Sequence, residues 1–331
     1  MTQAPETRDD GETGKIVTET SATETQSKWK RREHYVPRFY LNLFGEPLFV
    51  FDKQTGNVFS TTSKNIALEE GFYDLDPLID LEGQITENEN LMRDGLNELV
   101  DKMNPIAISP TARIRVSLFI ALQFVRTKEF RAAIKEMGGK MMTELVKDNP
   151  EFKKLDFKVV MKDKLAQVLQ AQHIVSDTVP QFAYILGTSV WTLLVNRTNV
   201  PFWTSDNPVS LYNPIDYGGM SGLGFAVRGI QTHFPLSSKL LLVILDPRSY
   251  PDTPVKIVKD PRKISYENEY QLYNATRFVI SSMNDFSAAK LLRDRDETLR
   301  KPPELVSVRT IEHHGRSIIQ VSGIPKRRSD Q

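Results

Sequence analysis

The sequence predicts an α+β fold, in which a central helical region with a buried helix packs against a mixed or antiparallel sheet from the C-terminal half. Two observations support this prediction. Helical periodicity dominates the middle of the chain, and short β-rich segments separated by Pro, Gly and Asn turns dominate after residue 188. Because helices and strands are segregated rather than alternating, an α+β arrangement is favoured over a doubly wound sheet.

The chain divides by composition into three segments. Residues 1–27 are acidic and rich in Thr and Ser, with too little apolar surface to offset the entropy of ordering, so we expect a disordered acidic tail. The basic run Lys28–Arg32 marks the domain edge, and residues 28–323 are predicted to form a single α+β domain. Residues 324–331 are predicted to be a basic, disordered tail.

The composition excludes several classes of protein. The 331 residues carry 43 Lys and Arg against 42 Asp and Glu, which argues against a broad nucleic-acid-binding or membrane-surface charge. Since there is no cysteine, a disulfide, a thiolate nucleophile, a zinc ribbon and an iron–sulfur cluster are all excluded. The N-terminus lacks the basic start and apolar run of a secretory signal, and no stretch reaches the roughly 20 apolar residues that span a bilayer. We therefore expect a soluble, cytoplasmic protein with no membrane partner.

Local signals predict the elements in chain order. A Gly-containing turn between β-rich runs predicts a hairpin over 48–60, and Thr86 with Glu89 three residues later forms a capping box at a helix start. Ser109 as N-cap and Pro110 at the first helical position predict a helix that is apolar all round and therefore buried. Further predicted elements are helices over 131–146 and 164–185, the latter kinked or broken at Pro180, strands over 191–195, 202–204, 240–245 and 278–282, a helix over 286–295, and strands over 305–309 and 317–321.

The string HYVPRFYLNLF, residues 34–44, is the first candidate site. Val36 precedes a proline and so avoids the helical region, which places His34 in extended or turn backbone. The aromatic and leucine side chains that follow would anchor the segment and hold the imidazole in a fixed place, as an acid–base or ligand role requires. The alternative is a buried histidine that hydrogen-bonds a loop. Arg38, in the same string, is a candidate substrate-binding residue.

The second candidate site lies on the predicted buried helix. Gln123, Arg126 and Thr127 are spaced i, i+3 and i+4, so they share a face of an otherwise apolar element. A buried guanidinium must be paired, and its planar fork suits a carboxylate or a phosphate equally. The sequence therefore leaves two alternatives: an internal pair with Asp or Glu, or binding of an anionic substrate.

The third candidate is Asp206, in the string SDNP. An apolar strand that ends in this string places Asp206 on a loop held by a Pro turn, a position that functional carboxylates often occupy. The alternative role is an Asx-turn cap. Among the other histidines, His173 has no partner four residues on, so HExxH chemistry is absent, and the spacing around His233 assigns it no role.

Together these strings resemble the domain of unknown function family 4238, an uncharacterised and mainly bacterial group. The resemblance spans about His34 to Leu292 and rests on the string at 34–44, Lys64-Asn65-Ile66 leading to Phe72-Tyr73, Gln123 with Arg126 and Thr127, residues 204–208 and Asn274. The family carries no established reaction. The resemblance therefore implies only that His34, Arg126 and Asp206 are matched family positions.

Two functions remain open from the sequence. One is a hydrolase acting on a phosphoester or nucleic acid, with His34 as general acid or base and Asp206 orienting it or helping to hold a divalent metal such as Mg²⁺ or Mn²⁺. Its phosphate-containing substrate would be bound by Gln123, Arg126, Thr127 and Arg38. The alternative is a non-catalytic nucleotide- or protein-binding module in a bacterial stress or defence pathway, in which these polar residues are internal pairs. Convergence of His34, Arg126 and Asp206 in one cleft would favour the enzyme.

Overall fold

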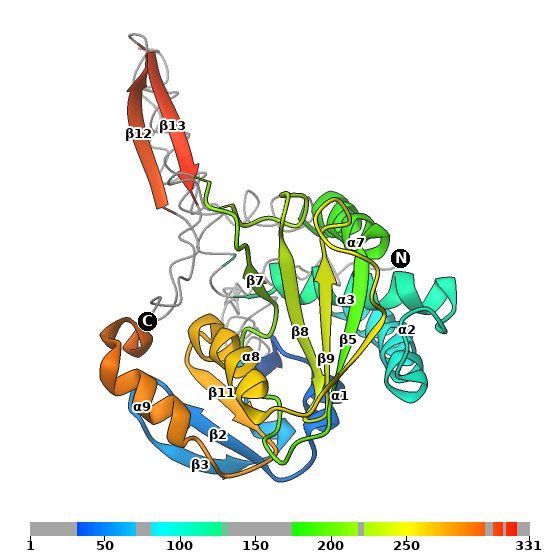
Figure 1. Ribbon diagram of the computed structural model, residues 1–331, viewed down its shortest axis with the longest axis vertical. Helices are drawn as coiled ribbons and strands as arrows, with labels where there is room; N and C mark the ends of the chain where they lie inside the picture. Colours follow the sequence, from blue (N-terminus) through cyan, green and yellow to red (C-terminus); the bar gives the residue numbers. More distant parts are fainter. Residues whose placement is uncertain are drawn as a thin grey trace, which may run out of the picture.

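The computed structural model describes residues 32–70, 81–127, 130, 174–217, 222–301, 307–313 and 316–322. The predicted acidic and basic tails and the predicted helix over 131–146 lie outside these residues, and the division into one domain and two tails stays a prediction. Within the described residues the chain has a mixed α+β architecture, as the sequence predicts (Figure 1).

The larger sheet comes entirely from the C-terminal half of the chain. Its strands lie in the order β10 (Val255–Val258), β5 (Val190–Asn196), β9 (Leu240–Leu245), β8 (Gln231–Ser237) and β7 (Ser210–Tyr212). Strand β10 runs parallel to β5 and the other neighbours are antiparallel, so the sheet is mixed. The predicted strands over 191–195 and 240–245 are confirmed.

The second sheet joins the predicted hairpin to later strands. Its order is β3 (Val58–Thr61), β2 (Leu48–Asp52), β11 (Phe278–Ser281) and β6 (Thr204–Ser205), with every neighbour antiparallel. Gly56 has φ +83° in the hairpin turn, a conformation that glycine adopts without steric cost. Two further pairs are β1 (Arg32–His34) with β4 (Leu68–Glu70) and β12 (Ser307–His313) with β13 (Arg316–Ser322).

The buried helix is α3 (Pro110–Val125), and it begins as predicted. The Ser109 hydroxyl accepts the Ala112 N–H at 3.1 Å, and Pro110 occupies the first turn, where its missing N–H costs nothing. Helix α3 packs between α2 (Leu81–Lys102) and α7 (Val179–Thr188) and against the five-stranded sheet, where the Phe119 and Phe234 ring centroids are 5.9 Å apart. The predicted packing of a buried helix on a sheet from the C-terminal half is therefore confirmed.

Both faces of the larger sheet are covered. Residues 240, 242 and 244 of β9 and Phe234 of β8 belong to the main apolar core with α3, whereas Leu241 and Val243 pack with Ile264 of α8 (Pro261–Asn274). Figure 1 shows α8 on the opposite side of this sheet from α3 and α7. The remaining short elements are α1 (Arg38–Leu41), η1 (Asn42–Phe44), η2 (Ser63–Asn65), the π-helix η4 (Ile174–Thr178), α9 (Ser287–Arg295) and η5 (Glu297–Arg300).

The structure refines several of the sequence predictions. Helix α2 already begins at Leu81, so Thr86 is inside the helix rather than its N-cap. Pro180 lies in the first turn of α7, after the π-helix, so of the two predicted alternatives the helix is broken near Pro180 rather than kinked, because a first-turn N–H needs no partner within the helix. Helix α8 is not among the predicted elements, although Asp260 caps it and Pro261 begins it. Among the described residues, no helix is long and apolar enough to cross a membrane.

Candidate functional site

The polar side chains of α3 hold the backbone that follows β1. Gln123 Nε2 donates to the Tyr35 carbonyl at 3.0 Å, and an Arg126 terminal nitrogen donates to the His34 carbonyl at 2.9 Å. Because residues three apart share one helix face, these two side chains meet two consecutive carbonyls. The structure thus brings the α3 residues to the His34 segment, through its backbone rather than its imidazole.

Arg126 also forms an ion pair. Its other terminal nitrogen lies 2.8 Å from Glu89 Oε1, and the side chains are 5% and 22% exposed. A guanidinium at this depth needs a carboxylate partner, and here the partner belongs to α2. This contact corresponds to the internal pair left open as an alternative by the sequence. Thr127, the next residue along the chain, donates its hydroxyl to the Phe124 carbonyl at 2.9 Å, a local bond at the end of α3.

The His34 imidazole faces a neighbouring loop. Its Nε2 lies 3.2 Å from the Ser63 carbonyl, and since a carbonyl only accepts, Nε2 carries the proton. Burial lowers the pKa of His34, the Ser63 carbonyl raises it, and the positive charge of Arg38 lowers it again, leaving the pKa below its ordinary value. The ring is therefore neutral at pH 7, with an acceptor lone pair on Nδ1. Arg38 itself is exposed.

Asp206 follows β6, and its carboxylate contacts the connection between α8 and β11. One carboxylate oxygen accepts the Thr276 N–H at 2.8 Å, and the other accepts the N–H groups of Arg277 at 2.9 Å and Phe278 at 3.1 Å. The residue is 1% exposed. By accepting these three N–H groups, the Asp206 carboxylate satisfies the backbone donors of a turn that lies 70 residues away in the sequence. This structural contact is distinct from the contacts of His34 and Arg126.

The part of the chain that the structure describes has no cluster of side chains that matches the divalent metal considered from the sequence. No group of three or more His, Asp or Glu side chains there could hold a metal ion. Mg²⁺ and Mn²⁺ take several oxygen ligands, and both Asp206 oxygens already face backbone donors. The residues present around Asp206 therefore do not fit a divalent metal.

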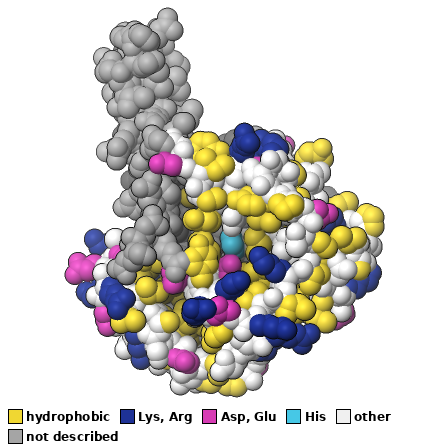
Figure 2. All heavy atoms as spheres, in the orientation of Figure 1, with side chains coloured by type: hydrophobic (Ala, Val, Ile, Leu, Met, Phe, Trp, Pro, Cys, Tyr) yellow, Lys and Arg dark blue, Asp and Glu magenta, His cyan; other side chains and the backbone are white. Residues whose placement is uncertain are grey.

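A hollow of about 480 Å³ lies where the N-terminal part of α8 meets β10 and β5. Leu194, Val258 and Ile264 form its apolar wall and belong to one packed cluster. The charged residues along it are Lys256, Asp260, Arg262, Lys263 and Glu267. Figure 2 shows Lys and Arg side chains gathered on the face over α8, β8 and β9. A hollow of this volume is within the range of small-molecule sites.

The charges of this hollow are only partly neutralised. Arg262 pairs with Asp260 through a 2.9 Å contact next to the start of α8. Lys256 and Lys263 are exposed, and within the described residues neither ammonium group has a carboxylate at ion-pair distance. Glu267 is instead bound by a histidine. The hollow therefore presents two ammonium groups to solvent, which favours an anionic ligand.

His233 holds Glu267 from the strand side. His233 Nδ1 lies 2.7 Å from Glu267 Oε2, and the side chains are 4% and 15% exposed. The Tyr270 ring packs against the imidazole with centroids 4.7 Å apart. Sequence reasoning assigned no role to either residue, because they are 34 positions apart on a strand and on an unpredicted helix. The Asp260-Pro261 start signal could have located α8 and thereby Glu267.

Within the described residues, the fold and these contacts define an α+β protein with a hollow lined by two lysines that have no carboxylate at ion-pair distance. Comparison with family models adds one match, to a family described as protein of unknown function (DUF4238), over residues 32–285. The chain therefore belongs to this family. Comparisons with curated proteins and with solved structures find no match.

Proposed function

We propose that the chain binds a phosphate-bearing small molecule, with a nucleotide as the representative ligand, in the hollow between β10 and α8. The proposal is carried by Lys256 and Lys263, two exposed ammonium groups that line one hollow and have no carboxylate at ion-pair distance among the described residues. Lysine binds phosphate as a point charge, and two such charges on one concave wall raise the local concentration of an anion.

Three residues that the sequence predicts for the hydrolase site, Gln123 and Arg126 for substrate binding and Asp206 for catalysis, instead make contacts that support the binding-module hypothesis. Gln123 and Arg126 hold backbone carbonyls, and Asp206 holds three backbone N–H groups. These contacts fix the fold, as the binding-module hypothesis expects of them. None of the three side chains lines the hollow.

Calorimetric titration with pyrophosphate and with nucleoside mono- and triphosphates tests the proposal. Lys256→Gln and Lys263→Gln are each expected to raise the Kd by about tenfold, since one lost charge-assisted contact is worth about 1.5 kcal/mol. Lys290→Gln, an exposed lysine on α9 outside the hollow, is the matched control and should leave the Kd unchanged. No binding at millimolar ligand, or equal Kd values for the wild type and the double variant, would refute the proposal.

A second candidate function is hydrolysis of a phosphoester or nucleic acid at His34. The observation that favours it is the neutral imidazole, anchored at Nε2 by the Ser63 carbonyl and carrying its lone pair on Nδ1, which is the form a general base requires. Arg38, close enough to lower the pKa of His34, would attract the phosphate.

Turnover of oligonucleotides and bis(p-nitrophenyl) phosphate, with Mg²⁺, Mn²⁺ or a chelator, tests this second candidate. His34→Ala is expected to lower kcat by about 100-fold or more if the imidazole is the base. Arg38→Gln should mainly raise KM, because it removes a charge that attracts substrate without touching the base. Equal turnover by the wild type and His34→Ala, or no turnover of any substrate, excludes His34 as a catalytic residue.

A further inference from the structure

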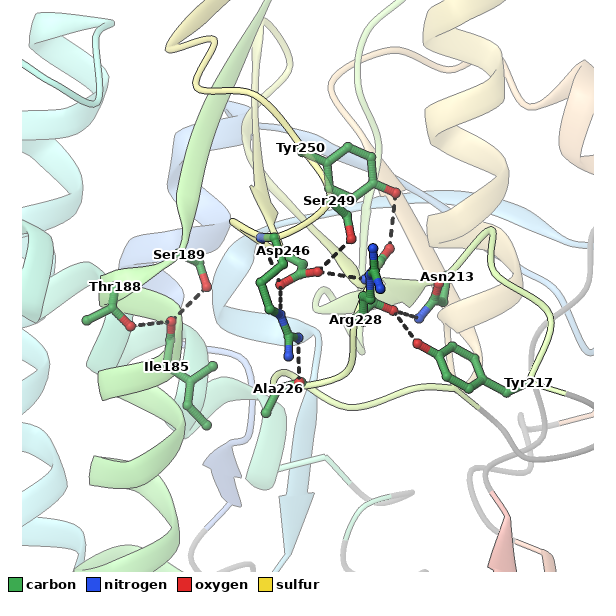
Figure 3. Close-up of polar contacts among 12 residues, drawn as sticks. Ile185, Thr188, Ser189, Asn213, Tyr217, Ala226, Arg228, Asp246, Ser249 and Tyr250 are labelled. Carbon is green, nitrogen blue, oxygen red and sulfur yellow. Dashed lines mark hydrogen bonds and ion pairs between the residues drawn. The ribbon is translucent and has the colours of Figure 1, made fainter.

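The orientation of the Glu267 carboxylate is set by a chain of hydrogen bonds that starts outside the hollow. The Tyr250 hydroxyl donates to the Gly229 carbonyl at 3.1 Å and accepts from Gln231 Nε2 at 2.8 Å. Figure 3 shows Tyr250 and Ser249 near Asp246, whose carboxylate accepts the Gly229 N–H at 2.8 Å. Because Gln231 uses its nitrogen for Tyr250, its amide oxygen is the atom that faces His233.

His233 therefore meets an acceptor at both ring nitrogens. Its Nε2 lies 3.2 Å from Gln231 Oε1, and its Nδ1 lies 2.7 Å from Glu267 Oε2. An amide oxygen and a carboxylate oxygen are both acceptors, so a ring N–H of His233 has an acceptor to donate to on either side. The imidazole is buried and packed on Tyr270, and it therefore holds the Glu267 carboxylate in one position.

Glu267 keeps one oxygen for a ligand. Oε2 is the atom bound by His233, and within the described residues no donor is bonded to Oε1. Glu267 lines the same hollow as Lys256 and Lys263. The wall of the hollow thus has two lysines that can bind an anion. It also has the Glu267 carboxylate, held in one position, which can accept hydrogen bonds from a ligand group that carries N–H donors.

We infer that Glu267 determines specificity, so that the hollow prefers guanine nucleotides, whose base donates N–H groups to this carboxylate. The inference rests on the proposed binding of a phosphate-bearing ligand. Guanine presents two adjacent donors, N1–H and the 2-amino group, to a carboxylate. Hypoxanthine presents only N1–H. Adenine and xanthine each place an acceptor atom beside their donor, and that acceptor repels the carboxylate.

Titration of the wild type with GMP, IMP, AMP, XMP and pyrophosphate gives the first test, which needs no variant. GMP is expected to bind about tenfold or more tightly than AMP or XMP, with IMP in between, as a bidentate contact to a base edge discriminates at this level. Pyrophosphate binding should depend on the lysines alone.

Glu267→Gln gives the second test, because an amide can retain the bond to His233 through its oxygen and turn its NH₂ group toward the ligand. The variant is expected to lose the preference for GMP by about tenfold and to gain XMP binding, while pyrophosphate affinity changes little. Glu269→Gln, two residues along the same helix and lining a different hollow, is the matched control and should keep the GMP preference. A residue that only supported the fold would lower all affinities together.

The outcomes separate this inference from the proposed function. If no nucleotide or pyrophosphate binds, the proposed function fails and the inference fails with it. If ligands bind in a lysine-dependent way but GMP, AMP and XMP agree within about twofold, the specificity inference alone is overturned. Thermal unfolding of each variant checks that it is folded, and if Glu267→Gln does not fold, the wild-type comparison of GMP with IMP and XMP decides.

Discussion

Asp206→Asn tests whether the carboxylate of Asp206 acts in the fold. Asparagine keeps one acceptor oxygen and replaces the other with a donor. That donor faces either the Thr276 N–H or the N–H groups of Arg277 and Phe278, which now lie 2.8–3.1 Å from the carboxylate. The variant therefore loses at least one of three charge-assisted bonds, whichever way the amide is turned.

The expected loss of stability follows from these contacts. A hydrogen bond to a charged group contributes about 1.5–3 kcal/mol, and the remaining bonds also weaken when the charge is removed, so Asp206→Asn should lower the free energy of unfolding by about 2–4 kcal/mol. The side chain is buried at 1% exposure, so solvent replaces little of the loss.

Urea unfolding followed by tryptophan fluorescence and circular dichroism measures this loss as a lower midpoint with an unchanged m-value. Asp101→Asn, which removes the same charge from an exposed position on α2, is the matched control and should stay within about 0.5 kcal/mol of the wild type. If Asp206→Asn is as stable as this control, the three bonds do not stabilise the fold, and a role of Asp206 in chemistry regains support.

Three further predictions concern other contacts. Burial alone would raise the pKa of Asp246, but the Gly229 N–H, the Arg248 guanidinium and the Ser249 hydroxyl outweigh it and lower that pKa to about 2. The folded-state pKa is lower than the pKa in the unfolded chain, which is near 4. The ionised carboxylate therefore adds about 2 kcal/mol to the free energy of unfolding above pH 4, and this contribution is lost as the pH falls to 2. Asp246→Asn should remove this pH dependence when urea unfolding is measured at each pH. Arg126→Met leaves Glu89 unpaired and should cost about 3 kcal/mol, with much of the loss restored by Glu89→Gln in a double-mutant cycle. Gly229→Ala places a Cβ 2.5 Å from Ile215 Cδ1 at φ +80° and should lower stability by about 1–3 kcal/mol in thermal unfolding, whereas Gly224→Ala, whose Cβ meets Val227 Cγ2 at 3.3 Å, should cost much less.

The sequence predicts the fold best where local signals suffice. Ser109-Pro110 locates the start of α3, and the apolar run at 240–245 coincides with β9. Helix α8 escapes prediction because its buried face contains Asn268 and Gln271 beside Ile264 and Leu272, so its apolar periodicity is weak. Glu89 satisfies a capping pattern but serves an ion pair, because α2 begins five residues before the apparent cap.

The candidate site is less accessible to sequence reasoning because its members meet only through the tertiary fold. Spacing places Gln123 and Arg126 on one face correctly, yet their partners are carbonyls, which no side-chain pattern reveals. The position of Asp206 at the end of a predicted strand marks it as a candidate, but the sequence does not show which groups its carboxylate binds. Lys256 comes from an edge strand, Lys263 and Glu267 from a helix, and His233 from a strand on the far side of β9, so no local motif contains them.

The contacts of Gln123 and Arg126 with the carbonyls of Tyr35 and His34 limit how far the chain can be shortened from its N-terminus. Removal of residues up to 31 leaves both acceptors in place. Removal up to residue 36 would deprive two side chains at the C-terminal end of α3 of their acceptors, although the helix itself is uncut. A deletion series that crosses this boundary should therefore change abruptly from folded to aggregated protein between those two end points.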